Sequence, residues 1–112
     1  MKFAKINNTS IHYKFEDAGS DKPLIVFSNS LATDFRIWQR CVDDLSTECS
    51  ILRYDKRGHG LSGMGTPPYQ IHDHVHDLVG LMDYLSLSNA IIVGLSVGGL
   101  IAQGTYHKRP DL

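Results

Sequence analysis

The sequence has few cysteines, and their number excludes a common class of small secreted protein. Only two, Cys41 and Cys49, occur in 112 residues, whereas a small secreted domain stabilised by disulfides normally carries four or more. Neither belongs to a Cys-x-x-Cys pair, so no zinc site is indicated at these residues. We therefore expect two reduced thiols in a cytoplasmic protein.

The sequence also lacks an excess of charge and a long apolar run. Eleven Lys and Arg residues oppose twelve Asp and Glu residues, giving a net charge of −1, which differs from the basic character of nucleic-acid-binding proteins. No apolar run approaches the roughly 20 residues of a membrane-spanning helix, and the N-terminus lacks the apolar stretch of a signal peptide. We expect no nucleic-acid partner and no membrane segment. The 42% of hydrophobic residues predict a buried core.

Alternating strand and helix patterns predict an α/β fold. Five short apolar or alternating segments predict strands at residues 3–6, 11–16, 24–27, 50–54 and 90–93. Apolar residues at helical spacing predict one helix from residue 34, a second over 69–86 and a third over 97–108. Thr33 or Asp34 is the expected cap of the first helix, whose buried face should carry Trp38, Cys41, Val42 and Leu45. An antiparallel hairpin should precede parallel strands with helices on both faces.

The most informative segment is Gly94-Leu95-Ser96-Val97-Gly98-Gly99, between the last predicted strand and the last predicted helix. Gly-x-Ser-x-Gly in this context is typical of a nucleophile elbow, a turn so tight that its serine adopts a strained backbone conformation. Gly94 and Gly98 lack Cβ atoms that would collide there, and Gly99 should let the helix pack closely. The Ser96 hydroxyl would be exposed at a helix start, where the Val97 amide faces a developing oxyanion.

Two other interpretations of this segment are open at this point. A glycine-rich turn between a strand and a helix can contain a serine that has no chemical role. A dinucleotide-binding fingerprint is a third possibility, but it requires Gly-x-Gly-x-x-Gly, and Ser96 stands where the second glycine is needed.

Two further segments occur in an order that is familiar from one superfamily. Asp55-Lys56-Arg57-Gly58-His59-Gly60-Leu61-Ser62 follows the strand at 50–54, and residues 27–34 follow the strand at 24–27, with Trp38 downstream. Together with the elbow, these motifs resemble the α/β-hydrolase superfamily along essentially the whole chain. The run Ser28-Asn29-Ser30-Leu31 is similar to the 3-oxoadipate enol-lactone hydrolases of the β-ketoadipate pathway of aromatic catabolism, although Ala32 replaces the glycine expected there.

The resemblance implies a serine hydrolase that opens 3-oxoadipate enol-lactone, a small molecule, without a metal or organic cofactor. Ser96 would be the nucleophile, and the backbone amides of Leu31 and Val97 would form the oxyanion hole. Arg36 and Arg57 are candidate ligands for the substrate's carboxylate. A general carboxylesterase of the same fold is the alternative, because the elbow by itself does not select the substrate.

The other polar residues are interpreted as structural or solvated. The resemblance implies that Asp55, Arg57 and His59 support the glycine-rich loop beside the site, so His59 is not the expected base. The alternating histidines of the second helix lack the acid of a zinc-protease motif. We expect four histidines to be solvated surface residues: His12, His72, His74 and His76.

A complete catalytic triad cannot be built from this sequence. In this fold an acid and then a histidine follow the serine, but the sixteen residues after Ser96 contain His107 before Asp111. On one helix, His107 would lie roughly 16 Å from Ser96, beyond hydrogen-bond reach.

The predicted fold is also short, with five strands where the superfamily core has about eight. The strand at 90–93 would be an exposed apolar edge, which natural proteins avoid. We expect residues 1–112 to be a single incomplete domain, the N-terminal portion of a hydrolase whose acid and histidine lie elsewhere. We expect the isolated 112-residue chain to be inactive, as a non-catalytic fragment that lacks the acid and the histidine.

Overall fold

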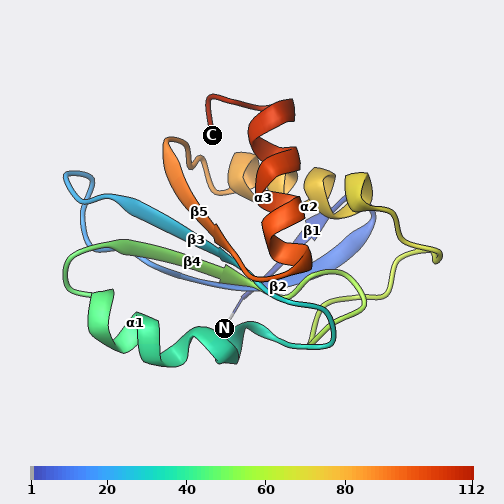
Figure 1. Cartoon of the computed structure of the whole chain (residues 1–112), viewed down its shortest axis with the longest axis horizontal. Coiled ribbons are helices and arrows are strands. Elements are labelled where there is room, and N and C mark those ends of the chain that lie inside the picture. Colours follow the sequence, from blue (N-terminus) through green and yellow to red (C-terminus); the bar gives the residue numbers. More distant parts are fainter. Residues whose placement is uncertain (1) are drawn as a thin grey trace.

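A five-stranded mixed sheet forms the centre of the computed structural model, which describes residues 2–112 (Figure 1). Its strands are β1 (Lys2–Ile6), β2 (Thr9–Glu16), β3 (Leu24–Ser28), β4 (Ser50–Tyr54) and β5 (Ala90–Gly94). They lie in the order β1-β2-β4-β3-β5. β2 is antiparallel to β1 and β4, whereas β3 is parallel to β4 and β5. The predicted hairpin followed by parallel strands is confirmed.

The hairpin turn is shorter than predicted. Asn7 and Asn8 adopt positive φ angles of 50° and 63°, and Ile6 pairs directly with Thr9. Asparagine tolerates this left-handed conformation, which matches the twist of the flanking strands in two-residue hairpins. Thr9 and the residue after it therefore belong to β2 rather than to the turn.

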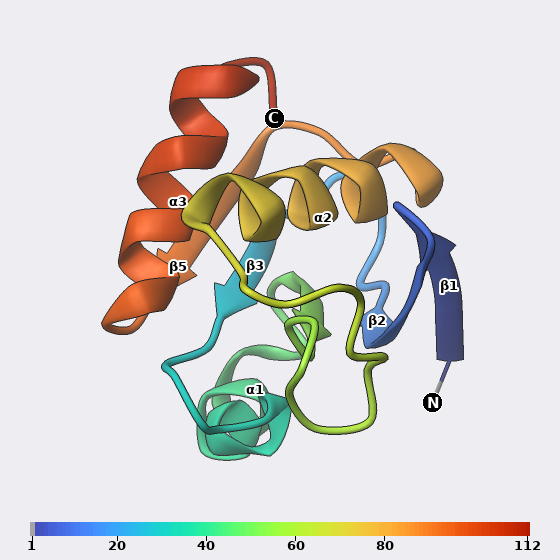
Figure 2. The ribbon, with the colours of Figure 1, turned by 90° about the vertical axis from the view of Figure 1, so that its right-hand side faces the viewer.

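Helices cover both faces of the sheet (Figures 1 and 2). α1 (Gln39–Leu45), preceded by the 3₁₀ helix η1 (Phe35–Trp38), lies on one face. α2 (Ile71–Tyr84) and α3 (Val97–Lys108) lie together on the other. Asp34 caps η1, because its side chain accepts a hydrogen bond from the Arg36 amide, as one of the two predicted caps.

The two helical layers enclose two apolar clusters. Val75, Leu78 and Met82 of α2 are buried against the hairpin and the central strands, as their spacing predicted. The cluster beneath α1 contains Phe27, Val42, Cys49 and Ile51. Cys41 is exposed, which corrects its placement on the buried face. The reason is that a 3₁₀ turn with three residues per turn precedes α1, so the spacing from Trp38 is not that of one continuous α-helix.

β5 forms an edge of the sheet within the described residues. It pairs with β3, and its outward side chains Ile91 and Val93 are 56% and 36% exposed. The predicted exposed apolar edge is therefore present. Among residues 2–112, no helix is long and apolar enough to cross a membrane.

Candidate active site

Ser96 lies at a sharp turn between the end of β5 and the start of α3. Its backbone has φ 56° and ψ −119°, a combination that costs free energy for any residue other than glycine. The residue is exposed. The turn thus presents a hydroxyl beside the start of α3, where the Gly98 and Gly99 amides donate to the carbonyls of Leu95 and Ser96 and the Val97 amide does not donate to a described residue.

Two of the three elbow glycines are required by close backbone approach. A Cβ atom at Gly94 would overlap the carbonyl of Gly98. At Gly98 it would lie 2.6 Å from the carbonyl carbon of Ser28 and 2.8 Å from the Asn29 oxygen. At Gly99 it would meet only the Gly94 oxygen at 3.8 Å, an ordinary contact. The expectation that Gly99 is needed for close packing is therefore wrong.

The same contacts bring the loop after β3 against the elbow. The amide of Leu95 donates a hydrogen bond of 3.1 Å to the Ser28 carbonyl, and Gly98 lies against Ser28 and Asn29. Leu31 follows two residues later and is 67% exposed. Within residues 2–112, neither the Leu31 amide nor the Val97 amide donates a hydrogen bond. Both remain available to an incoming acceptor.

The loop after β3 is fixed from below by buried side chains. Asn29 is fully buried; its amide nitrogen donates to the Tyr54 carbonyl at 3.3 Å, and its amide oxygen accepts from the Trp38 indole at 2.6 Å. Trp38 in turn stacks on Phe27, with ring centroids 4.5 Å apart. The tryptophan quoted for the superfamily resemblance therefore positions this loop. Sequence reasoning did not foresee that contact.

Lys56 makes the second set of contacts to this loop. Its ammonium donates to the carbonyl of Asn29 at 3.3 Å and to that of Ser30 at 2.8 Å. The Ser30 carbonyl also accepts the hydroxyl of Thr33 at 2.8 Å. Lys56 is 1% exposed, and this burial lowers its pKa to about 8, because desolvation disfavours the charged form.

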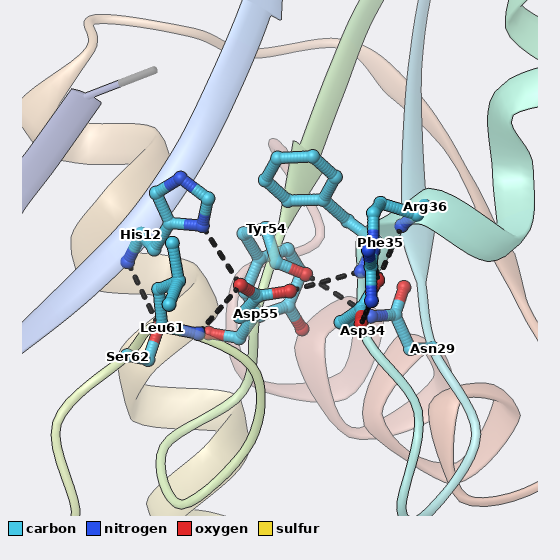
Figure 3. Close-up of polar contacts among 9 residues, drawn as sticks. All are labelled: His12, Asn29, Asp34, Phe35, Arg36, Tyr54, Asp55, Leu61 and Ser62. Carbon is cyan, nitrogen blue, oxygen red and sulfur yellow. Dashed lines mark hydrogen bonds and ion pairs between the residues drawn. The ribbon is translucent and has the colours of Figure 1, made fainter.

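Asp55 joins three segments beneath the site (Figure 3). Its carboxylate accepts the backbone amides of Phe35 at 2.9 Å and Leu61 at 3.1 Å, and it lies 2.8 Å from Nδ1 of His12. Ser62 closes the network, since its hydroxyl donates to the Asp55 carbonyl and accepts the His12 amide. The motif after β4 thereby ties β2, the loop after β3 and its own glycine turn together, as the structural interpretation predicted.

The fold and the elbow described above are those of a known protein family. The family model described as alpha/beta hydrolase fold matches residues 23–112, which include β3, the elbow and α3. The chain belongs to the α/β-hydrolase family. The predicted fold class is thereby confirmed.

Several relatives of this hydrolase chain have named activities. It is 37% identical over 92 residues to 3-oxoadipate enol-lactonase 2 of Acinetobacter baylyi, which covers 82% of this chain and 34% of that protein. The enol-lactonase structure from Burkholderia xenovorans LB400 shares 40% identity with a TM-score of 0.92, covering 98% of this chain and 43% of that one. A 2-(acetamidomethylene)succinate hydrolase of Mesorhizobium japonicum is 31% identical over 90 residues, or 80% of this chain and 32% of that protein. The chain spans about a third of the curated relatives it matches.

Neither arginine named as a carboxylate ligand has a free guanidinium in this hydrolase chain. Arg57 is 8% exposed and donates two hydrogen bonds, of 2.6 and 2.8 Å, to Asp77 of α2. Arg36 pairs with Asp34 at the surface and lowers the pKa of that carboxyl. Arg57 therefore anchors the loop after β4 to α2, in keeping with the structural role that the resemblance implied.

Two of the four histidines expected at the surface are buried. His12 is 4% exposed, stacks on Phe35 with centroids 4.9 Å apart and contacts Asp55. His74 is 7% exposed on α2, and burial lowers its pKa. The alternation in β2 was misleading because Phe35, from another segment, covers the face of the sheet on which His12 lies. His72 and His76 are exposed, as predicted.

The hydrolase chain has a cavity of about 480 Å³ away from the elbow, on the α1 side of the sheet. Its lining includes His12, Phe35, Arg36 and Arg53, and Ser96 is not part of it. Among residues 2–112, no cluster of three or more His, Cys, Asp or Glu side chains is arranged to bind a metal ion.

The described residues do not give Ser96 a hydrogen-bonded base. His59 contacts the carbonyl of Arg57 at 3.1 Å instead, and His107 lies near the far end of α3. No hydrogen bond links the Ser96 hydroxyl to a side chain of residues 2–112. The site therefore consists of a strained serine and two free amides.

Proposed function

We propose that this chain carries the nucleophile and the oxyanion-binding loop of a serine hydrolase. The observation that carries the proposal is the conformation of Ser96, because a strained serine at the end of a parallel strand and the start of a helix is the geometry of a nucleophile elbow. Neighbouring backbone atoms leave no room for a side chain at Gly94 or Gly98 in that turn. Strained backbone conformations of this kind cluster at active sites.

The reaction follows from the positions of these groups. The Ser96 oxygen attacks the carbonyl carbon of a lactone or ester while a general base takes its proton. The carbonyl oxygen becomes negative and accepts hydrogen bonds from the amides of Leu31 and Val97. The bond to the leaving oxygen then breaks, that oxygen takes the proton, and water hydrolyses the acyl-enzyme. The proposed base is a histidine. None of the histidines in residues 2–112 is hydrogen-bonded to Ser96, so it is not one of the contacts described above.

The proposed substrate is 3-oxoadipate enol-lactone, opened to 3-oxoadipate in aromatic catabolism. The support is the 37% and 40% identity to enol-lactonases and the run Ser28 to Leu31 at the proposed oxyanion loop. Opening this ring releases an enolate, a good leaving group, so the acylation step places little demand on an acid. We place this reaction in the cytoplasm, with no nucleic-acid or membrane partner.

The test uses the complete gene product, rather than the isolated 112-residue chain, with enol-lactone and with p-nitrophenyl acetate as substrates. A burst of p-nitrophenol, one per chain, is expected from the natural sequence and is lost in Ser96→Ala. Ser88→Ala, at an exposed loop serine, is the matched control and should keep the burst. A fluorophosphonate should label the peptide that contains Ser96.

Two results would contradict the proposal at different levels. Equal rates from the natural sequence and Ser96→Ala, with no fluorophosphonate label, would exclude nucleophilic catalysis by Ser96. A Ser96-dependent burst with the ester, together with no turnover of the enol-lactone, would favour a general carboxylesterase over a lactonase.

A further inference from the structure

Lys56 is a buried ammonium whose two hydrogen bonds go to carbonyl oxygens rather than to a carboxylate. The acceptors are the carbonyls of Asn29 and Ser30, consecutive residues of the loop after β3. Burying a charge without an opposite charge as its hydrogen-bond partner costs free energy, and Lys56 is 1% exposed. An apolar side chain of similar length would avoid this cost. This cost indicates that the ammonium has a function at these two carbonyls.

The Ser30 carbonyl belongs to the same peptide unit as the Leu31 amide. A trans peptide is planar, so its C=O and N–H bonds point in opposite directions. The ammonium draws the Ser30 oxygen toward the interior at 2.8 Å. The Leu31 N–H must then point outward, on the side where Leu31 is exposed. Fixing one end of this peptide fixes the direction of the other.

We propose that Lys56 is a positioning residue that orients and polarises the Ser30–Leu31 peptide, so that the Leu31 amide is a stronger donor to the reacting carbonyl oxygen. This inference rests on the proposed function of Ser96 and assigns the preparation of the oxyanion hole to a residue outside it. A hydrogen bond from a charged donor is about twice as strong as a neutral one. Accepting it draws electron density toward the oxygen and makes the N–H of the same peptide more acidic.

The charge on Lys56 can be removed near neutral pH, which makes the coupling measurable. Desolvation lowers the pKa of Lys56 to about 8, and the neighbouring Asp55 opposes that shift. Burial and then the charge of Lys56 lower the pKa of His74, on α2, below its usual value. His74 is thus already neutral when Lys56 loses its proton, so a change above pH 7 reports on Lys56.

The first experiment measures the peptide directly and does not need catalysis. The chain contains two Ser–Leu peptides, Ser30–Leu31 and Ser86–Leu87. With carbonyl-¹³C serine and ¹⁵N leucine, carbon-detected NMR observes these two peptides alone, even where amide protons exchange rapidly. The Ser30 carbonyl shift should titrate with a midpoint near pH 8, and the Ser86 shift should stay flat between pH 7 and 10.

Two variants assign that titration. Lys56→Met keeps the length of the side chain but has no charge or donor, and it should abolish the Ser30 titration. Lys22→Met makes the same change at an exposed lysine and should leave it intact. A Ser30 carbonyl that does not move between pH 7 and 10 in the natural sequence would overturn the proposal. So would a titration that survives in Lys56→Met.

The second experiment measures the consequence for turnover in the gene product. Lys56→Met should lower kcat by between about tenfold and a hundredfold, less than the roughly 10²–10³-fold loss when an oxyanion donor is removed. KM should change little, because the hydrogen bond from the Leu31 amide to the reacting carbonyl oxygen strengthens in the transition state. Lys56→Arg, which keeps donors and charge, should recover part of kcat and lose less activity above pH 8 than the natural sequence does.

The outcomes separate the two proposals. If Ser96→Ala abolishes turnover while Lys56→Met has an unchanged kcat, the role of Lys56 is wrong and the role of Ser96 stands. If Ser96→Ala has no effect, the proposed function fails, and the carbonyl titration still decides whether Lys56 controls the peptide. If Lys56→Met does not fold, the titration of the natural sequence and the pH profile of Lys56→Arg decide.

Discussion

Adding a single methyl group at Gly98 should destabilise the fold far more than adding one at Gly99. Both glycines lie in the first turn of α3, so helix propensity alone would make either change to alanine favourable by about 0.5–1 kcal/mol. The surroundings differ. The Cβ atom at Gly98 would be within 2.8 Å of both the Ser28 carbonyl carbon and the Asn29 oxygen, whereas real Cβ atoms essentially never approach closer than 3.0 Å.

The size of the effect follows from what must move. Overpacking a core costs typically about 1–3 kcal/mol when side chains can adjust. At Gly98 the obstacle is the backbone of the loop after β3, so we expect Gly98→Ala to cost about 3 kcal/mol and Gly98→Val more. Gly99→Ala meets only the Gly94 oxygen at 3.8 Å. It should therefore stabilise the chain by up to about 1 kcal/mol.

Urea and thermal unfolding can measure both changes with the fluorescence of Trp38, the single tryptophan. A loss of 3 kcal/mol corresponds to a fall in Tm of more than about 10 °C for a domain of this size. Gly99→Ala should raise Tm by a few degrees. Equal stability of Gly98→Ala and the natural sequence would show that the elbow does not pack against the loop after β3, and would refute the argument.

Three further perturbations test other parts of the structure. Asp77→Ala should lower the free energy of unfolding by about 3–5 kcal/mol, because it leaves a buried guanidinium unpaired; a change below 1 kcal/mol in urea unfolding would contradict the buried ion pair. Burial lowers the pKa of His74, so the unfolded chain binds protons more tightly and stability should fall as pH drops below about 6.5. His74→Gln should reduce that fall and the exposed His76→Gln should not, and equal slopes would disprove it. Cys41 should react rapidly with a thiol reagent in the folded chain and Cys49 only on unfolding; equal native rates would contradict the exposure of Cys41 and the burial of Cys49.

The order of strands and helices could be predicted because it depends on local pattern. The spacing of Val75, Leu78 and Met82 is enough to identify the buried face of α2, since a helix exposes one side wherever it packs. The elbow was equally readable, because Gly94 and Gly98 flank a serine between an apolar strand and a helix. These local patterns can be recognised without knowing which segments of the chain contact each other in the folded protein.

The polar interior could not be predicted, because it depends on partners that are distant in sequence. His12 alternates with apolar residues as a solvated strand residue would, and only the approach of Asp55, 43 positions away, explains its burial. Lys56 follows directly after β4, and no local pattern in the sequence marks it as buried. Its role appears only when the loop after β3 folds over it.

The sequence by itself therefore determined the fold class, the family resemblance and the position of the candidate nucleophile Ser96. These depend on short-range periodicity and on turn geometry that only glycine permits. Tertiary structure alone decided which polar side chains are buried and what they contact. A buried ammonium or imidazole is tolerated only where other segments supply its hydrogen bonds, and those segments come together only when the sheet order β1-β2-β4-β3-β5 has formed.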